Sequence, residues 1–240
     1  MNPNNSSQRA TGDTTPAAAT PAPVAGGSTT TSTRVATAMW RLATRDGDTA
    51  TTRSDTRFVS RLARRLVLTY TRRGDAIIDF DGDTALRDAA TATTRTYVAL
   101  TRRDKIATIN RLIRPASLTI LRWPRDGLAA TSAETADLLL ACQFITATAP
   151  STLAIISTIQ ADDTSTSHSP EVGALLDAAA KARFRHQQRI LALPSDDDSD
   201  TYTYFPSDAD TDAALNTWRD TTRPGVRIDV LRLTTSGAPR

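Results

Sequence analysis

Cysteine is nearly missing from this sequence of 240 residues, which contains only Cys142. A single cysteine excludes an intrachain disulfide and any cysteine-rich zinc site. Its position inside the apolar run LLLACQF indicates a small core residue rather than a nucleophile. Such cysteine usage is typical of a reducing compartment, and we therefore expect a cytoplasmic protein.

Histidine and long apolar runs are also scarce. His168 and His186 do not have the spacing of metal ligands, so we predict no metal site. No apolar run approaches the roughly 18 residues that a membrane-spanning helix needs. The first residues, MNPNNSSQRATGD, lack the basic-then-apolar order of a secretory signal. These absences predict a protein without a membrane partner.

Lysine is rare as well, because Lys105 and Lys181 are the only lysines among the 29 Lys and Arg residues. The net charge is +3, and the hydrophobic and charged fractions of 39% and 23% are ordinary for a soluble globular protein. The excess of Arg, Ala, Thr and Asp indicates the composition of a GC-rich genome. Clustered arginines are nevertheless candidates for phosphate contacts, since a guanidinium group pairs with phosphate through two hydrogen bonds.

The composition changes near residue 33. Residues 1–33 are rich in Thr, Ala and Pro and have almost no large apolar side chains, so they cannot bury enough surface to offset the entropy of ordering. We predict a disordered tail over 1–33 and one domain over 34–240. Where this domain begins, VATAMWRLAT predicts a short piece docked on the core, and RDGDTATTRSD predicts a loop.

Helical and strand patterns alternate from Phe58 onward. A helix starting there has apolar residues on one half and arginines on the other. Thr131 and Glu134 form a predicted capping box for a later helix. Strands are predicted at 76–80, 96–100, 117–123 and 151–159 and in QRILALP, TYTYF and VRIDVLRL. This alternation predicts a Rossmann-like, three-layer α/β/α fold with a mostly parallel sheet of about seven strands.

The turn in AIIDFDGDTAL, residues 76–86, is the strongest candidate site. Open parallel sheets bind ligands at the carboxyl ends of strands, where the strand order reverses. This turn follows the first predicted strand of the sheet and carries three aspartates around Gly82. Two interpretations stay open, namely phosphoryl chemistry on a magnesium ion and the binding of a nucleotide-like cofactor.

The first interpretation depends on the order of the aspartates. AIIDFDGDTAL resembles the first motif of the haloacid dehalogenase-like phosphatases, a hydrophobic strand followed by Asp-x-Asp-Gly-Thr. The resemblance implies that Asp79 is the nucleophile and Asp81 the proton donor. Asp162 and Asp163 would hold Mg²⁺, which prefers oxygen ligands, and Lys105 would balance the phosphate. An extra aspartate after the glycine departs from the motif.

The second interpretation uses the segments around the turn, over about residues 58–108. TYTRRGD, IIDFDGDTAL and TTRTYVAL follow one another as a helix end, a strand with its turn, and a second strand. In this order they resemble the S-adenosylmethionine-dependent methyltransferases, particularly the DNA amino-methyltransferases. The resemblance implies a methyltransferase-like Rossmann domain over 34–240 and S-adenosylmethionine as its cofactor. The implied cofactor-binding residues are Asp79, Phe80, Asp81, Gly82, Asp83 and Thr101.

Three positions depart from the methyltransferase pattern. The turn keeps only Gly82 of the family's glycines and continues with Asp83. The second strand leads to Thr101, where the family has a carboxylate for the ribose hydroxyls. The family's catalytic motif is (Asp/Asn/Ser)-Pro-Pro-aromatic, whereas LRWPR offers Trp123 and Pro124 in the opposite order as the nearest catalytic candidates. We therefore predict methyltransferase descent with the activity lost or changed.

Arginines near the strand ends suggest a nucleic-acid partner. Arg102 and Arg103 follow the second strand, and Arg122 and Arg125 flank the Trp-Pro pair. Around the predicted cleft these arginines could hold DNA phosphates while Trp123 stacks on a base. Three hypotheses result. They are a degenerate methyltransferase acting on DNA, a non-catalytic nucleic-acid or protein-binding module on the same fold, and a magnesium-dependent phosphatase.

Overall fold

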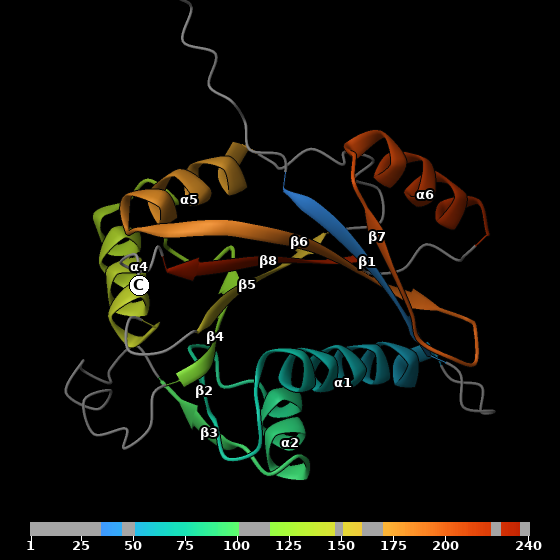
Figure 1. Ribbon diagram of the computed structural model, residues 1–240, viewed down its shortest axis with the longest axis horizontal. Helices are drawn as coiled ribbons and strands as arrows, with labels where there is room; N and C mark the ends of the chain where they lie inside the picture. Colours follow the sequence, from blue (N-terminus) through green and yellow to red (C-terminus); the bar gives the residue numbers. More distant parts are fainter. Residues whose placement is uncertain are drawn as a thin grey trace, which may run out of the picture. The chain divides into compact units, whose positions relative to one another are not determined.

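The computed structural model describes residues 35–44, 51–100, 116–146, 151–159, 170–221 and 227–235, which are coloured in Figure 1. All of them belong to the unit Arg34–Arg240. In chain order the elements are β1 (Ala36–Ala43), α1 (Thr51–Tyr70), β2 (Ala76–Asp79), α2 (Thr84–Ala92), β3 (Thr96–Ala99), β4 (Ala116–Trp123), α4 (Ala133–Thr146), β5 (Thr152–Ile159), α5 (Pro170–Lys181), β6 (Phe184–Ser195), β7 (Thr201–Phe205), α6 (Asp208–Thr221) and β8 (Arg227–Thr235).

The strands form one sheet in the order β3-β2-β4-β5-β8-β6-β1-β7. The pairs β2–β3, β2–β4, β4–β5 and β1–β6 are parallel, whereas β5–β8, β6–β8 and β1–β7 are antiparallel. The predicted α/β class is confirmed. Of the predicted mostly parallel sheet of about seven strands, the direction is wrong, because the described part of the chain forms a mixed sheet of 8 strands.

The mixed character comes from β7 and β8. Only residues 196–200 separate β6 from β7, and so short a connection reverses the chain, whereas a parallel neighbour needs a crossover of a dozen residues or more. β8 lies between β5 and β6 and runs antiparallel to both. Local sequence patterns identify a strand but not its neighbours, so they did not predict these directions.

β1 corrects the prediction of a short piece docked on the core. It is a strand of the sheet, with β6 on one side and β7 on the other. Thr37 to Trp40 are all buried, so both faces are covered and the alternation of a half-buried strand is missing. Trp40 packs in the cluster that includes α1, and Met39 packs in the cluster that includes α6. The predicted loop after β1 is also corrected, because α1 begins within it at Thr51.

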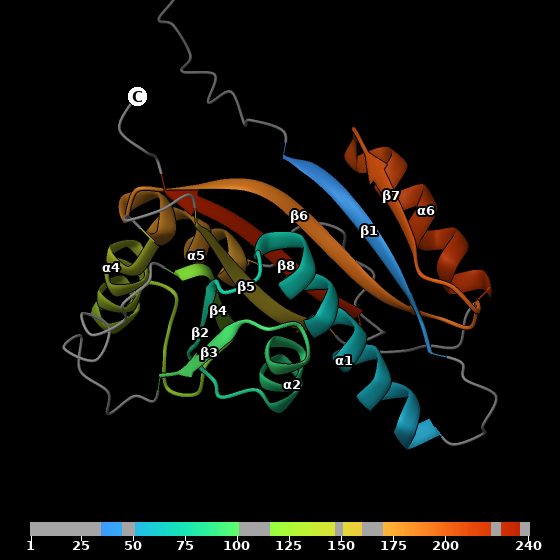
Figure 2. The ribbon, with the colours of Figure 1, turned by 60° about the horizontal axis from the view of Figure 1, so that its bottom comes forward.

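Helices cover both faces of the sheet, as Figures 1 and 2 show. α1 and α2 pack on one face, and α4, α5 and α6 pack on the other. Successive residues of β5 divide between the two cores. Ala154 and Ile156 face the α1 side, whereas Leu153 and Ile155 face α4 and α5. The described elements are therefore arranged in three layers, α/β/α.

α1 is amphipathic, and its arginine side has partners within the protein. Its apolar side, including Leu66, is buried against the sheet. Arg61 Nη1 lies 3.0 Å from Asp200 Oδ1, and the Arg65 guanidinium lies 3.8 Å from the centroid of the Tyr202 ring. Two arginines of this side therefore contact the β6–β7 region, whereas Arg64 is exposed. Neither α1 nor any other described helix is long and apolar enough to span a membrane.

β2, α2 and β3 form the parallel unit on which the site prediction depends. Ala76 pairs with Thr96, and Asp79 pairs with Ala99, in parallel register. The prediction of two neighbouring parallel strands joined by a helix is therefore confirmed. Their carboxyl ends lie at one edge of the sheet, and the turn 80–83 follows β2 at that edge.

The N-terminus of α4 differs from the predicted capping box by one residue. Ser132 Oγ accepts a hydrogen bond from the N–H of Thr135 at 3.2 Å, and α4 begins at Ala133. Ser132 is thus the N-cap, in place of Thr131. The two hydroxyl residues are adjacent, so the sequence pattern does not distinguish them.

Candidate functional site

The order of strand addition reverses between β2 and β4. After β2 the chain adds β3 on one side, and the next described strand, β4, lies on the other side. In α/β sheets ligands bind outside the carboxyl ends of strands at such a switch point. Asp79 ends β2 at this edge, and it pairs with Ile120 of β4, which extends further to Trp123. The acidic turn and the end of β4 therefore face each other at the switch point.

Asp79 is fully buried and holds the turn together. Its Oδ1 accepts the N–H of Asp81 at 2.9 Å. Its Oδ2 accepts the N–H of Asp83 at 2.6 Å and the hydroxyl of Tyr97 at 2.7 Å. Burial, together with this hydrogen bond to Asp79, raises the pKa of Tyr97, so the hydroxyl keeps its proton and keeps donating. Both carboxylate oxygens are thus used to fix the turn.

Asp83 connects the turn to α2 and to β4. Its Oδ1 accepts the N–H groups of Ala85 at 2.7 Å and Leu86 at 3.4 Å, as the N-cap of α2. Its Oδ2 pairs with the guanidinium group of Arg122. Helix N-terminal amides of this kind bind anionic ligand groups in nucleotide-binding folds. Here two of them are bound by the chain itself.

Asp81 makes the second connection to β4. Its Oδ2 accepts the N–H of Arg122 at 2.7 Å, an amide that has no β2 residue opposite it because β2 ends at Asp79. Its Oδ1 lies 2.8 Å from Nη1 of Arg125, whose side chain is only 13% exposed. Burial raises the pKa of Asp81, against the opposing effect of the Arg122 amide and the Arg125 charge. Asp81 therefore replaces the missing strand partner.

Gly82 has a conformational role in the turn. Its φ of +69° lies in the left-handed region that favours glycine. A Cβ atom at this position would meet no atom within 4 Å. The glycine therefore permits the turn, and no neighbouring group in the described structure requires its lack of a side chain.

Two ion pairs close the switch point. Asp83 with Arg122 and Asp81 with Arg125 join the turn to the end of β4. A ligand between the two strand ends would have to separate these side chains. The described residues also contain no group of three or more His, Cys, Asp or Glu side chains that could hold a metal ion.

The predicted catalytic residues, Trp123 and Pro124, lie at and just after the end of β4 rather than in the turn. Trp123 is 3% exposed and packs in the core with residues of α4 and α5, so its ring cannot stack on a base without leaving the core. Pro124, next to it, is exposed. Phe80 is partly buried against the same core. The predicted site residues that lie outside the described part of the chain are Thr101, Arg102, Arg103, Lys105, Asp162 and Asp163.

Sequence reasoning missed Tyr97 and both ion pairs. The sequence interpretation assigns Arg122 and Arg125 to phosphate contacts, yet each of them pairs with an aspartate of the turn. The available signal was the opposite charge of two strand ends, an acidic end after β2 and a basic end at β4. That signal is useful only when β2 and β4 are known to be neighbours.

A cavity of about 240 Å³ lies beside Asp83 and Arg122, under α1. The apolar side of α1 forms one wall, and the residues of β4, β5 and β8 that face this helix form the opposite wall. The sequence predicts the apolar side of α1 but not the gap that it leaves above the sheet. We call this space the α1 cavity, and its lining consists of Phe58, Val59, Leu62, Ala63, Leu66, Asp83, Leu86, Arg122, Ile156, Thr158 and Ile228.

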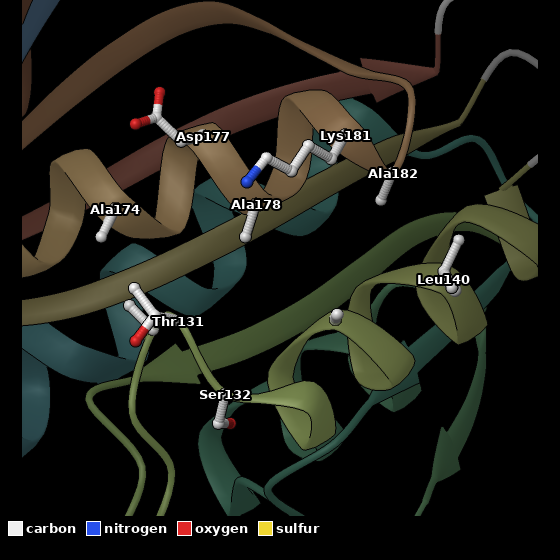
Figure 3. A pocket seen from close by; sticks show the side chains of 10 residues that line it. Thr131, Ser132, Leu140, Ala174, Asp177, Ala178, Lys181 and Ala182 are labelled. Atoms are coloured by element: carbon white, nitrogen blue, oxygen red, sulfur yellow. The ribbon is translucent and has the colours of Figure 1, made fainter.

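A second hollow, of about 280 Å³, lies between α4 and α5 (Figure 3). Figure 3 shows Asp177 and Lys181 on α5 and Leu140 on α4. Alanines from both helices form much of the lining. The helices that form this hollow cover the face opposite to α1, and no predicted site residue lines it.

S-adenosylmethionine, the cofactor implied by the methyltransferase resemblance, does not fit the described residues. The turn amides are bound to Asp79 and Asp83, and the end of β3, at Ala99 and Leu100, has no carboxylate for ribose hydroxyls. The α1 cavity, at about 240 Å³, is smaller than the roughly 300–1,000 Å³ of usual ligand pockets. Its lining is mostly apolar, with Asp83, Arg122 and Thr158 as the polar residues, whereas the cofactor has an amino-acid group and a ribose that both need polar partners.

No protein-family model and no curated protein match the chain. Among solved structures it is similar to YbdL from Escherichia coli, described as having a methionine aminotransferase function, with 16% identity and a TM-score of 0.37 over 72% of this chain. The match covers 40% of YbdL, so this chain spans about two fifths of that protein. A structure from Galdieria sulphuraria that is named as a sarcosine dimethylglycine methyltransferase has 10% identity and a TM-score of 0.41, over 75% of this chain and 86% of that one. At these TM-scores neither similarity bears on function.

Proposed function

We propose that this chain is a non-catalytic binding module on a methyltransferase-like fold. The parallel β2–α2–β3 unit with an acidic turn at the switch point supports that fold. The observation that carries the loss of catalysis is the engagement of Asp79, Asp81 and Asp83 by donors of the chain itself. The carboxylates and amides of this turn are hydrogen-bonded within the chain, so neither is available to bind a cofactor.

The same contacts disfavour phosphoryl transfer. A nucleophilic aspartate must present an oxygen to the phosphorus atom. Both oxygens of Asp79 accept hydrogen bonds within a fully buried site. We therefore expect no release of phosphate from model esters, with or without Mg²⁺.

DNA is the nucleic-acid partner of this proposal, and its binding depends on arginines that reach phosphates. Arg125 is nearly buried and paired with Asp81, so its contribution should be small. Arg122 has a side chain that is 49% exposed and keeps donors beyond its pair with Asp83. Retention of DNA should therefore weaken with salt and with loss of Arg122, Arg102 and Arg103, since each phosphate contact adds to the salt dependence.

Calorimetric titration of the full chain with S-adenosylmethionine and S-adenosylhomocysteine tests the proposal. We expect no saturable heat from either compound and no transfer of labelled methyl groups to DNA. Arg125→Ala, which frees one carboxylate oxygen of Asp81, is the matched variant and should also give no heat, because the amides stay bound to Asp79. Saturable heat from the wild type, accompanied by methyl transfer, would contradict the proposal.

A further inference from the structure

We propose that the α1 cavity binds a small, largely apolar molecule that carries one anionic group. This inference rests on the proposed function, because it names the ligand class of a binding module whose turn does not take S-adenosylmethionine. The lining, the volume and the charge beside the cavity each support it.

The lining favours an apolar ligand. Leu62 and Leu66 of α1, Leu86 of α2, and Ile156 and Ile228 of the sheet all contribute to it, and each of these side chains is buried. Water beside these five side chains is held poorly, because a buried water needs two to four polar partners. An apolar molecule regains the dispersion contacts that the empty space forfeits.

The volume sets the size of the ligand. A dry apolar cavity of about 150 Å³ holds benzene. The α1 cavity, at about 240 Å³, is larger than this by more than half. Two fused aromatic rings, or an aliphatic body of the same size, therefore match it. A molecule as large as S-adenosylmethionine does not.

The charges beside the cavity determine the sign of the ligand's polar group. Asp83 and Arg122 are the charged side chains in the lining. The Asp83 oxygens already accept hydrogen bonds from Ala85, Leu86 and Arg122. Arg122 has five N–H donors on its guanidinium group, and its half-exposed side chain pairs with Asp83 through one nitrogen.

An anionic group on the ligand can therefore pair with Arg122 in the lining of the cavity. The remaining Arg122 donors can bind a carboxylate where the cavity meets solvent, and hydrogen bonds between arginine and carboxylate are among the strong ones. A cationic group would meet the charge of Arg122, and the negative charge of Asp83 is already paired. The preferred ligand is consequently an arene or alkyl carboxylate rather than an amine.

Three probes with one body test this assignment. 2-Naphthoate, 2-naphthol and 2-naphthylmethylammonium share two fused rings and differ in charge. In calorimetric titrations of the full chain, we expect naphthoate to bind about tenfold more tightly than naphthol, as a charge-assisted hydrogen bond implies. The ammonium probe should bind most weakly.

Matched variants test the location. Ala63→Phe fills the α1 cavity and should abolish binding of naphthoate and naphthol, whereas Ala174→Phe, in the hollow of Figure 3, should change neither by more than about twofold. Arg122→Gln should lower the affinity for naphthoate about tenfold and leave the affinity for naphthol unchanged. It should raise the affinity for the ammonium probe, because Asp83 loses its ion-pair partner. Arg64→Gln, which removes an exposed arginine of α1, is its control.

The outcomes separate this inference from the proposed function. The ligand assignment is overturned if neither naphthoate nor naphthol gives saturable heat. It is also overturned if Ala63→Phe still binds these probes, or if the three probes bind with the same affinity regardless of their charge. If circular dichroism shows that Ala63→Phe does not fold, nuclear Overhauser contacts between naphthoate and the Phe58 ring of the wild type decide the location instead, and their absence overturns it. Heat from S-adenosylmethionine overturns the proposed function whatever naphthoate does.

Discussion

Replacement of Asp79 by Asn should destabilise the protein, because we assign its carboxylate to the structure of the turn rather than to chemistry. Asn has nearly the same shape but only one acceptor oxygen, since the other oxygen becomes an NH₂ donor. In the wild type, one oxygen serves Asp81 and the other serves Asp83 and Tyr97. In either orientation the NH₂ group faces at least one N–H donor.

The magnitude follows from these contacts. A hydrogen bond to a charged group contributes about 1.5–3 kcal/mol, and a buried donor left without an acceptor costs about 1–3 kcal/mol. If the amide oxygen stays with Asp83 and Tyr97, only the bond from Asp81 is lost. We therefore expect Asp79→Asn to lower the free energy of unfolding by about 2–4 kcal/mol. Tyr97→Phe removes one donor from the same carboxylate, and its cost should be about 1.5 kcal/mol, the lower end of that range, because Tyr97 is only half-buried.

Urea unfolding followed by circular dichroism measures these differences. Asp88→Asn, at an exposed position of α2, is the control and should stay within about 0.5 kcal/mol of the wild type. An Asp79→Asn protein as stable as this control would refute the structural role. Replacement of a catalytic carboxylate is often neutral or stabilising, so that result would return Asp79 to the list of candidate nucleophiles.

Three other predictions concern Cys142, Asp81 and Leu66. Burial raises the pKa of Cys142 to about 12, so a disulfide reagent at about pH 8 should modify it only after urea unfolds the chain, and prompt reaction of the native protein would contradict its burial. Burial also raises the pKa of Asp81, so the folded state binds this proton more tightly than the unfolded chain does. Its contribution to stability should therefore fall as pH rises above the ordinary aspartate pKa. If the difference in unfolding free energy between wild type and Asp81→Asn stays constant from about pH 3 to pH 7, this prediction is refuted. Leu66→Ala removes a fully buried side chain and should cost about 3 kcal/mol in urea unfolding, whereas a loss below about 1 kcal/mol would show that α1 packs loosely.

The sequence was sufficient for elements with a clear period and for the position of the turn. β2 and β5 are short apolar runs between polar segments, and α1 has a clear apolar side from Phe58 onward. β1 was missed because it is covered on both faces and is rich in Ala and Thr, which leaves no alternation to detect. Its place between β6 and β7 depends on pairing with residues more than 150 positions away in the sequence, as the hydrogen bond from Thr44 to Ser195 illustrates.

The chemistry of the turn could not be predicted from its own residues. Asp79 and Asp81 are equivalent in sequence, as carboxylates that end or follow a strand. Their roles are set by partners 18 and 41 residues further along the chain, the Tyr97 hydroxyl and the Arg122 amide. The same turn with those partners directed elsewhere would have free carboxylates, as both sequence interpretations require. Tertiary neighbours, not the motif, therefore decide between a binding turn and a closed one.

Amide hydrogen exchange at Asp81 and Asp83 tests directly whether the turn is closed by its own contacts. Both amides donate to the buried carboxylate of Asp79. We predict slow exchange in the wild type, with no change when 1 mM S-adenosylmethionine is added. Rapid exchange of both amides without the cofactor, replaced by protection in its presence, would show that the turn is open to a ligand and would contradict this account.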